Sequence, residues 1–142
     1  MAAYFKKILV PVDGSPHAEK ACRHAVGLAR DGGAEIILLH CYGELPITIG
    51  GASREEIIAD SEKEARQFLA PCLRHCEENK TPCRSIIHNG SPSRMIVQVA
   101  REEHCDLIVM GSRGLSEFSG LVMGSVSHRV LEYADIPILI VK

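Results

Sequence analysis

Residues 106–114 read DLIVMGSRG, with four consecutive apolar side chains that stop at a glycine. An unbroken apolar run is typical of a strand that is buried on both faces, as in a parallel sheet. Similar or shorter runs recur along the chain. They predict five strands, at residues 5–12, 34–41, 84–88, 106–110 and 138–141.

Helical segments separate the predicted strands and span residues 15–30, 53–79, 91–104 and 125–133. A Ser-Pro pair opens the first and the third, which is typical of an N-cap followed by the first helical turn. Ser53 and Glu56 form a capping box for the long second helix. Pro71 lies inside that helix and is expected to kink or split it.

This alternation predicts an α/β fold: an open, doubly wound five-stranded parallel sheet with helices on both faces. Ligands bind such sheets beyond the carboxyl ends of the strands, where the strand order reverses. Chemically distinctive segments follow the first and the fourth strand, at residues 11–15 and 111–127. If both segments belong to one site, those two strands are neighbours and the order is 3-2-1-4-5.

The length of 142 residues suits a single domain that covers residues 1–142. Hydrophobic residues make up 46% and charged residues 24%, the balance of a globular protein. The net charge of −2 gives no reason to expect a nucleic-acid partner. No apolar run approaches the ~18 residues of a membrane span. Because no signal-peptide core follows the N-terminal lysines, we expect a cytoplasmic protein.

The six cysteines follow no simple ligand pattern. Cys72, His75, Cys76 and Cys83 come closest to a metal-binding group. They lack the paired C-x2-C spacing of a structural zinc site, so we expect ordinary reduced thiols.

The connection after the fourth predicted strand is unusually long and rich in glycine. It has thirteen residues, 111–123, and connections of that length are usually functional or disordered. The next helix begins at Gly124 and Ser125, and the first amides of a helix attract anions. Gly124 lets a phosphate approach, Ser125 and Ser127 offer hydroxyl donors, and Gly111 and Gly114 can turn the preceding amides into a nest. The alternative is an ordinary strand-end turn followed by an ordinary helix cap.

The run G111-S-R-G114, nine residues, then G124-S125 resembles the G-x2-G-x9-G-[S/T] nucleotide motif of the universal stress protein family. The resemblance extends to KILVPVDGS near the start, DLIVMGSRG in the middle and GSVSHRVLEYADIPILIVK at the end. It implies a five-stranded α/β fold, binding of ATP or of AMP or ADP, homodimers, and a cytoplasmic protein of the stress response.

The resemblance also implies a set of site residues. Adenine and ribose are assigned to Pro11, Val12, Asp13 and Cys41 at the end of the second strand. Phosphates are assigned to Gly111, Arg113, Gly114, Gly124, Ser125 and Val126. Met110 and Ser127 complete the candidate site. Cys41 stands where an aliphatic residue is common, and we expect it to act as a small hydrophobe.

Two of these residues have more than one interpretation. Asp13 suits ribose hydroxyls or a Mg²⁺ ion near the phosphates, and it equally suits a turn before Gly14. Arg113 could reach a terminal phosphate or remain solvated.

These patterns predict a nucleotide-binding regulatory protein, with ATP as the expected ligand. No catalytic residues are assigned, because the Walker lysine of G-x4-G-K-[ST] is absent, and slow ATP hydrolysis is the most that we expect. One alternative is a family member that acts only through protein contacts. A phosphoacceptor receiver domain needs a second carboxylate that this chain does not offer. A redox protein that uses Cys41, or Cys72 and Cys76, would need the C-x-x-C spacing that is absent here.

The last strand lies at a sheet edge in the predicted order. An apolar edge invites pairing, so we expect Pro137–Lys142 to meet the same segment of a second copy. The contacts would come from Ile138, Leu139, Ile140 and Val141. The alternative is an unpaired edge guarded by Pro137 and Lys142.

Overall fold

The sheet has the predicted order. The computed structural model describes residues 5–43, 45, 48, 50–114 and 123–142. Its strands are β1 (Lys7–Pro11), β2 (Glu35–Tyr42), β3 (Cys83–Asn89), β4 (Leu107–Gly111) and β5 (Ile138–Val141). Every neighbouring pair is parallel, and the order β3-β2-β1-β4-β5 confirms the predicted topology.

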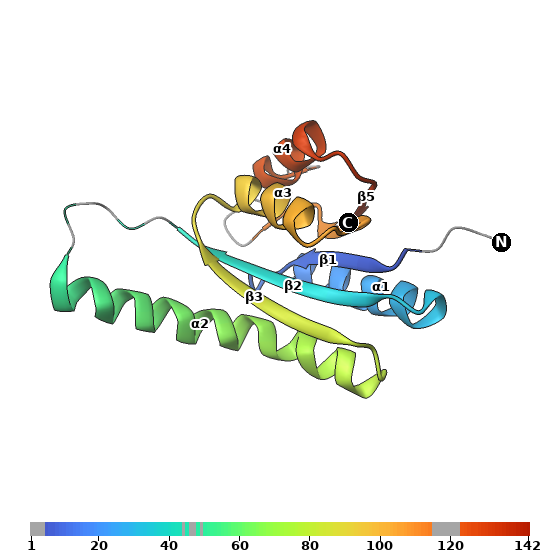
Figure 1. Cartoon of the computed structure of the whole chain (residues 1–142), viewed down its shortest axis with the longest axis horizontal. Coiled ribbons are helices and arrows are strands. Elements are labelled where there is room, and N and C mark those ends of the chain that lie inside the picture. Colours follow the sequence, from blue (N-terminus) through green and yellow to red (C-terminus); the bar gives the residue numbers. More distant parts are fainter. Residues whose placement is uncertain (1–4, 44, 46–47, 49, 115–122) are drawn as a thin grey trace.

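Helices cover both faces of the sheet (Figure 1). They are α1 (Pro16–Gly32), α2 (Gly51–Glu78), α3 (Pro92–Glu102) and α4 (Ser125–Tyr133). Alternate residues of a strand point to opposite faces. Ile8 and Val10 of β1 therefore join a core with α1 and α2, whereas Leu9 joins a second core with α3 and α4. The protein is thus a three-layer α/β/α sandwich.

The start of α1 follows from its sequence. Ser15 is the N-cap, and its hydroxyl accepts a hydrogen bond from the Ala18 N–H at 3.1 Å. Gly14, just before it, has φ of +85°, a conformation that glycine adopts without strain. The turn after β1 therefore leads directly into the helix.

One prediction about α2 is wrong. The helix starts at Gly51 with Gly50 as N-cap, so Ser53 and Glu56 lie inside it and do not cap it. Gly51 has φ of +62°, which allows the chain to turn into the helix two residues early. The helix continues through Pro71 without a split, and the kink expected there stays a prediction. Side chains buried on both sides of the proline, among them Leu69 and Cys72, hold the two halves against the sheet.

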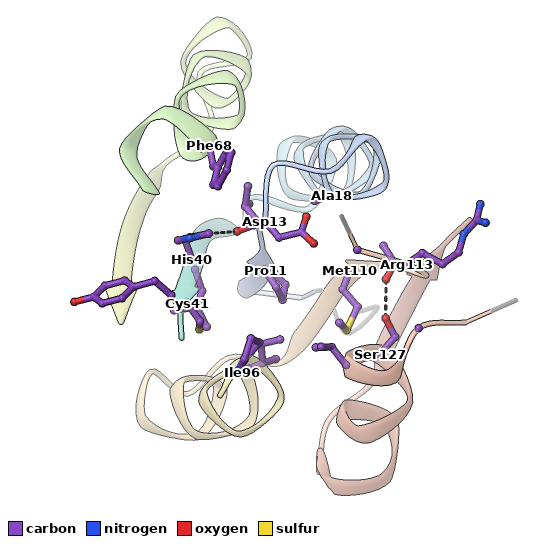
Figure 2. Close-up of a pocket in the computed structure, with 18 of the residues that line it drawn as sticks. Pro11, Asp13, Ala18, His40, Cys41, Phe68, Ile96, Met110, Arg113 and Ser127 are labelled. Carbon is purple, nitrogen blue, oxygen red and sulfur yellow. Dashed lines mark hydrogen bonds between the residues drawn. The ribbon is translucent and has the colours of Figure 1, made fainter. Parts of the chain in front are cut away.

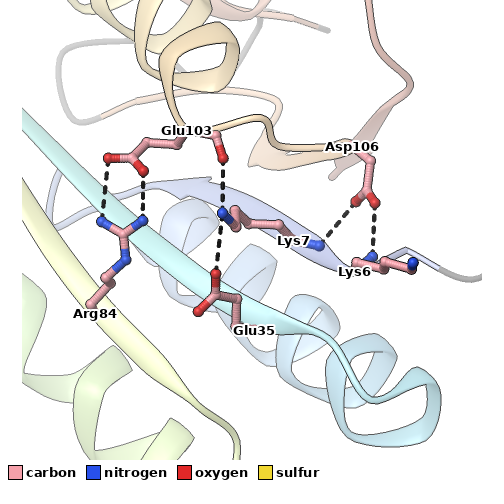
Figure 3. Close-up of polar contacts among 6 residues, drawn as sticks. All are labelled: Lys6, Lys7, Glu35, Arg84, Glu103 and Asp106. Carbon is pink, nitrogen blue, oxygen red and sulfur yellow. Dashed lines mark hydrogen bonds and ion pairs between the residues drawn. The ribbon is translucent and has the colours of Figure 1, made fainter.

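Ion pairs and hydrogen bonds join the starting ends of the strands (Figure 3). Asp106 accepts the backbone N–H groups of Lys6 and Lys7 at 2.8 and 3.1 Å. The Lys7 ammonium reaches the Glu103 carbonyl oxygen at 2.9 Å and the Glu35 carboxylate at 3.4 Å.

Arg84 extends this group of contacts to β3. Its guanidinium donates to both carboxylate oxygens of Glu103, at 3.3 and 2.6 Å, and this contact lowers the pKa of Glu103. The amino end of the sheet is thus closed by charged contacts. Among the described residues, no helix has the length and apolar character needed to cross a membrane.

Replacing a buried side chain of α2 tests this packing. Leu69 is 1% exposed, so Leu69→Ala should lower the free energy of unfolding by about 2–5 kcal/mol through lost burial and a residual cavity. Leu28 on α1 is 41% exposed, and Leu28→Ala should change the free energy of unfolding by about 0.5 kcal/mol or less. Urea unfolding followed by circular dichroism measures both, and equal effects would contradict the arrangement.

Candidate functional site

A cavity of about 480 Å³ opens at the carboxyl ends of β1, β2 and β4 (Figure 2). Ligand sites in doubly wound sheets form where the strand order reverses, which here is between β1 and β4. All twelve residues of the predicted site line this one cavity: Pro11, Val12, Asp13, Cys41, Met110, Gly111, Arg113, Gly114, Gly124, Ser125, Val126 and Ser127. The structure therefore brings together segments from opposite ends of the chain.

The start of α4 forms one wall of the cavity. Gly124 is its N-cap and donates its N–H to the Ser112 carbonyl oxygen at 2.6 Å. The Ser127 hydroxyl donates to the Gly111 carbonyl oxygen at 2.8 Å. These two bonds fasten the positive end of the helix dipole to the end of β4. The hydroxyl proton of Ser127 is therefore donated to the backbone of β4 in this structure.

Close contacts explain why residues 111 and 114 are glycines. A Cβ on Gly111 would lie 2.7 Å from the His17 Cβ, where β4 meets α1. A Cβ on Gly114 would lie 2.6 Å from the Asp13 Oδ2 atom. Neither glycine has a positive φ. The nest of amides expected around these two glycines stays a prediction. Residues 115–122 of the glycine segment lie outside the described residues.

Asp13 serves the turn and also faces the cavity. One carboxylate oxygen, Oδ1, accepts the Ser15 N–H at 2.9 Å, which fixes the turn after β1. The carboxylate points into the space between the strand ends (Figure 2). The two interpretations from the sequence are thus compatible, because one oxygen holds the turn while the side chain lines the cavity.

Arg113 lies at the rim. Its guanidinium donates to the Nε2 atom of His17 at 3.0 Å and points away from the centre of the cavity (Figure 2). His17 belongs to the first turn of α1 and was not identified from the sequence. This contact ties the glycine segment to α1.

The wall near β2 is apolar. Leu39, Ile96 and Met110 line the cavity from β2, α3 and β4. Burial raises the pKa of the Cys41 thiol to about 12, so this side chain is neutral at physiological pH. A neutral thiol among aliphatic side chains supplies the small hydrophobe that the sequence predicted.

Sequence reasoning missed the contribution of α2. Phe68 lies over the turn after β1, where a Cβ on Gly14 would come within 2.5 Å of its ring. The Phe68 ring packs against His40 with centroids 5.3 Å apart. His40 donates from Nδ1 to the Val12 carbonyl oxygen at 2.7 Å. Glu64, one helical turn before Phe68, adds a second carboxylate to the lining. No local signal marks these residues, since α2 reaches the cavity only through tertiary packing.

The described residues contain no group of three or more His, Cys, Asp or Glu side chains arranged to hold a metal ion. Asp13 as a magnesium ligand therefore stays a prediction.

Comparison with known proteins decides the family. The profile of the universal stress protein family matches residues 4–142. The chain belongs to the universal stress protein family. Universal stress protein YxiE of Bacillus subtilis is 34% identical, with 97% of this chain and 99% of that protein covered.

Solved universal stress protein structures agree with the fold. The structure of MJ0577 of Methanocaldococcus jannaschii has a TM-score of 0.89 and 31% identity, and the match covers 99% of this chain and 97% of that one. A universal stress protein of Archaeoglobus fulgidus, solved in complex with dAMP, has a TM-score of 0.70 and 25% identity, covering 99% of this chain and 100% of that one.

The close contact at Gly111 makes a testable prediction. Gly111→Ala should lower the free energy of unfolding by about 1–3 kcal/mol, because the new methyl group overlaps His17. A methyl group added to Gly27, in the middle of α1, would meet no atom within 4 Å, so Gly27→Ala should stabilise by about 0.5–1 kcal/mol through helix propensity. Urea denaturation measures both, and a neutral Gly111→Ala would contradict the contact.

Proposed function

We propose that this protein binds an adenine nucleotide, with ATP as the expected ligand, and acts as a regulatory protein of the stress response in the cytoplasm. The observation that carries the proposal is the cavity, because one hollow gathers all twelve residues predicted from the sequence. Its volume of about 480 Å³ lies in the range of small-molecule sites.

The two ends of the cavity suit the two ends of a nucleotide. The apolar wall of Leu39, Cys41 and Ile96 suits an adenine base. The N-terminus of α4 suits phosphates, because its dipole and its first amides favour anions. Asp13 lies between them and suits ribose hydroxyls, or a Mg²⁺ ion carried by the phosphates. The dAMP complex of the Archaeoglobus fulgidus relative supports an adenine nucleotide as the class of ligand.

The proposal is binding without rapid turnover. The chain has no Walker lysine to stabilise phosphoryl transfer. A protein that retains its nucleotide without hydrolysing it can act as a sensor of the adenine nucleotide levels of the cell, because its nucleotide-bound fraction follows those levels. Rapid, saturable hydrolysis of ATP with Mg²⁺ by the purified protein would overturn this part of the proposal.

Blocking the phosphate end tests the binding site. Gly124→Val should weaken ATP binding about tenfold or more, corresponding to about 1.4 kcal/mol, because the isopropyl group obstructs the N-terminus of α4. Isothermal titration calorimetry with ATP and with AMP measures the loss. Mass spectrometry of the nucleotide released from denatured wild-type protein identifies the natural ligand.

Gly50→Val is the matched control. Gly50 is also an N-cap, but it caps α2 and does not line the cavity. A Cβ added at this position would have no neighbour within 4 Å, so the larger side chain has room. Equal weakening by both variants, or no adenine nucleotide bound to the wild-type protein, would contradict the proposed site.

We also propose a homodimer through β5. The strand lies at the end of the sheet order, and Leu139 on it is 39% exposed. Ile108 and Ser112 donate their N–H groups to the carbonyl oxygens of Pro137 and Val141. Because successive residues of a strand alternate, the backbone groups of Ile138 and Ile140 face the open edge. A second copy can pair with them around a two-fold axis.

Removing one outward N–H tests this interface. Ile140→Pro should convert a dimer to a monomer, because proline cannot donate to a partner strand while the bonds to β4 remain. Ile140→Val keeps the N–H and should stay dimeric. Light scattering gives the mass, and circular dichroism checks the fold. A folded Ile140→Pro protein that remains dimeric would refute the β5 interface.

A further inference from the structure

A second hollow lies away from the candidate site, in a groove between α3 and α4. These two helices lie side by side over one face of the sheet (Figure 1). The groove has a volume of about 810 Å³ and shares no lining residue with the cavity at the strand ends. It is therefore a separate feature, and an inference from it does not rest on nucleotide binding.

Helical spacing places the side chains of both walls of the groove. Arg94, Val97 and Arg101 follow one another at intervals of three and four residues, which keeps them on one face of α3. Arg129 and Tyr133 are four residues apart and share one face of α4. Val97 is only 7% exposed, so it supplies an apolar base with arginines on the helices at either side.

The groove is positively charged in a chain that is slightly acidic. Three arginines and one glutamate, Glu102, line it, whereas the whole chain has a net charge of −2. The Glu102 carboxylate accepts a hydrogen bond from the Gln98 amide at 2.8 Å. The Arg101 guanidinium is engaged within the fold, because it pairs with the Asp135 carboxylate at 3.0 Å. The other two arginines decide what the groove can bind.

Arg94 and Arg129 are available to a partner. Both are exposed, and neither forms an ion pair or a side-chain hydrogen bond with another residue in the part of the chain that the structure describes. Tyr133 lies beside them and is 63% exposed. Arginine and tyrosine are enriched at protein interfaces, because a guanidinium binds a carboxylate through two hydrogen bonds and an aromatic ring supplies contact area. The groove thus has the composition of a docking surface for carboxylates.

We propose that this groove docks a short acidic segment of a partner protein. Carboxylates of the segment pair with Arg94 and Arg129, while its apolar atoms pack on Val97 and Tyr133. A chain of carboxylates suits the groove better than one small anion, because Arg94 and Arg101 are two helical turns apart, ~10.5 Å along the helix axis. The 11 residues of α3 span ~16 Å, which about five residues of extended chain cover.

A peptide titration followed by NMR spectroscopy tests the docking surface. The probe is a peptide of about six residues in which Glu and Ser alternate, and its control has Gln in place of every Glu. With isotope-labelled full-length protein at low salt, we expect the acidic peptide to shift the amide signals of α3 and α4 in a saturable manner. The glutamine peptide should leave these signals in place, because it offers no carboxylates.

Two double variants with the same change in net charge complete the test. Arg94→Glu combined with Arg129→Glu should weaken binding of the acidic peptide about tenfold or more, because like charges then face its carboxylates. Arg23→Glu combined with Arg74→Glu is the matched control, since both residues are exposed on α1 and α2, over the opposite face of the sheet. The control should change the affinity by less than about twofold.

The outcomes separate this docking surface from other anion sites. Signals that do not saturate, shifts that map outside α3 and α4, or equal weakening by both double variants would each overturn the proposal. Inorganic tripolyphosphate and a short RNA oligonucleotide are titrated in parallel. If either binds in the groove and the acidic peptide does not, the groove serves another class of anion and the proposal is wrong. The comparison of the two peptides on wild-type protein stands even if a variant folds poorly.

Discussion

The parallel arrangement of the strands is the constraint on which the rest of this structure depends. Each central strand is buried on both faces and must be covered by two helical layers. Each crossover returns the chain to the same end of the sheet, so the carboxyl ends of the strands share one edge. The order reverses between β1 and β4, where connections leave toward opposite faces. The cavity is the space that this reversal leaves open.

The predicted parts of the fold rest on local patterns. Apolar runs and Ser-Pro starts determine strands and helices within a few residues, and the shared edge then follows from topology. The prediction of the capping box failed because tertiary packing outweighs a local signal. Ser53 has the sequence of a cap but lies inside α2, and Pro71 does not interrupt that helix, because buried neighbours hold it to the sheet.

The site was predictable where its residues are adjacent in sequence and not where they arrive by packing. Asp13 and the glycine segment can be recognised in the sequence because each directly follows an apolar run that predicts a buried strand. Phe68 and His17 reach the cavity region only because helices settle on the sheet, and neither carries a motif. Gly111 lines the cavity, and the structure gives a reason for this glycine that the sequence did not show: the nearness of α1, with no unusual backbone angle. Helix α2 also links features that the sequence treats separately, since its middle brings Phe68 to the cavity and its last turn brings Cys76 into the core shared with α1.

The two ends of the sheet are held by different forces. The Lys7–Glu35 and Arg84–Glu103 contacts at the starting end are ion pairs between partly exposed side chains, so dissolved salt screens them. The bonds that fasten α4 to β4 beside the cavity join uncharged groups. A change in ionic strength therefore acts first on the edge farthest from the cavity. The two hydrogen bonds that hold α4 against β4 are much less sensitive to salt.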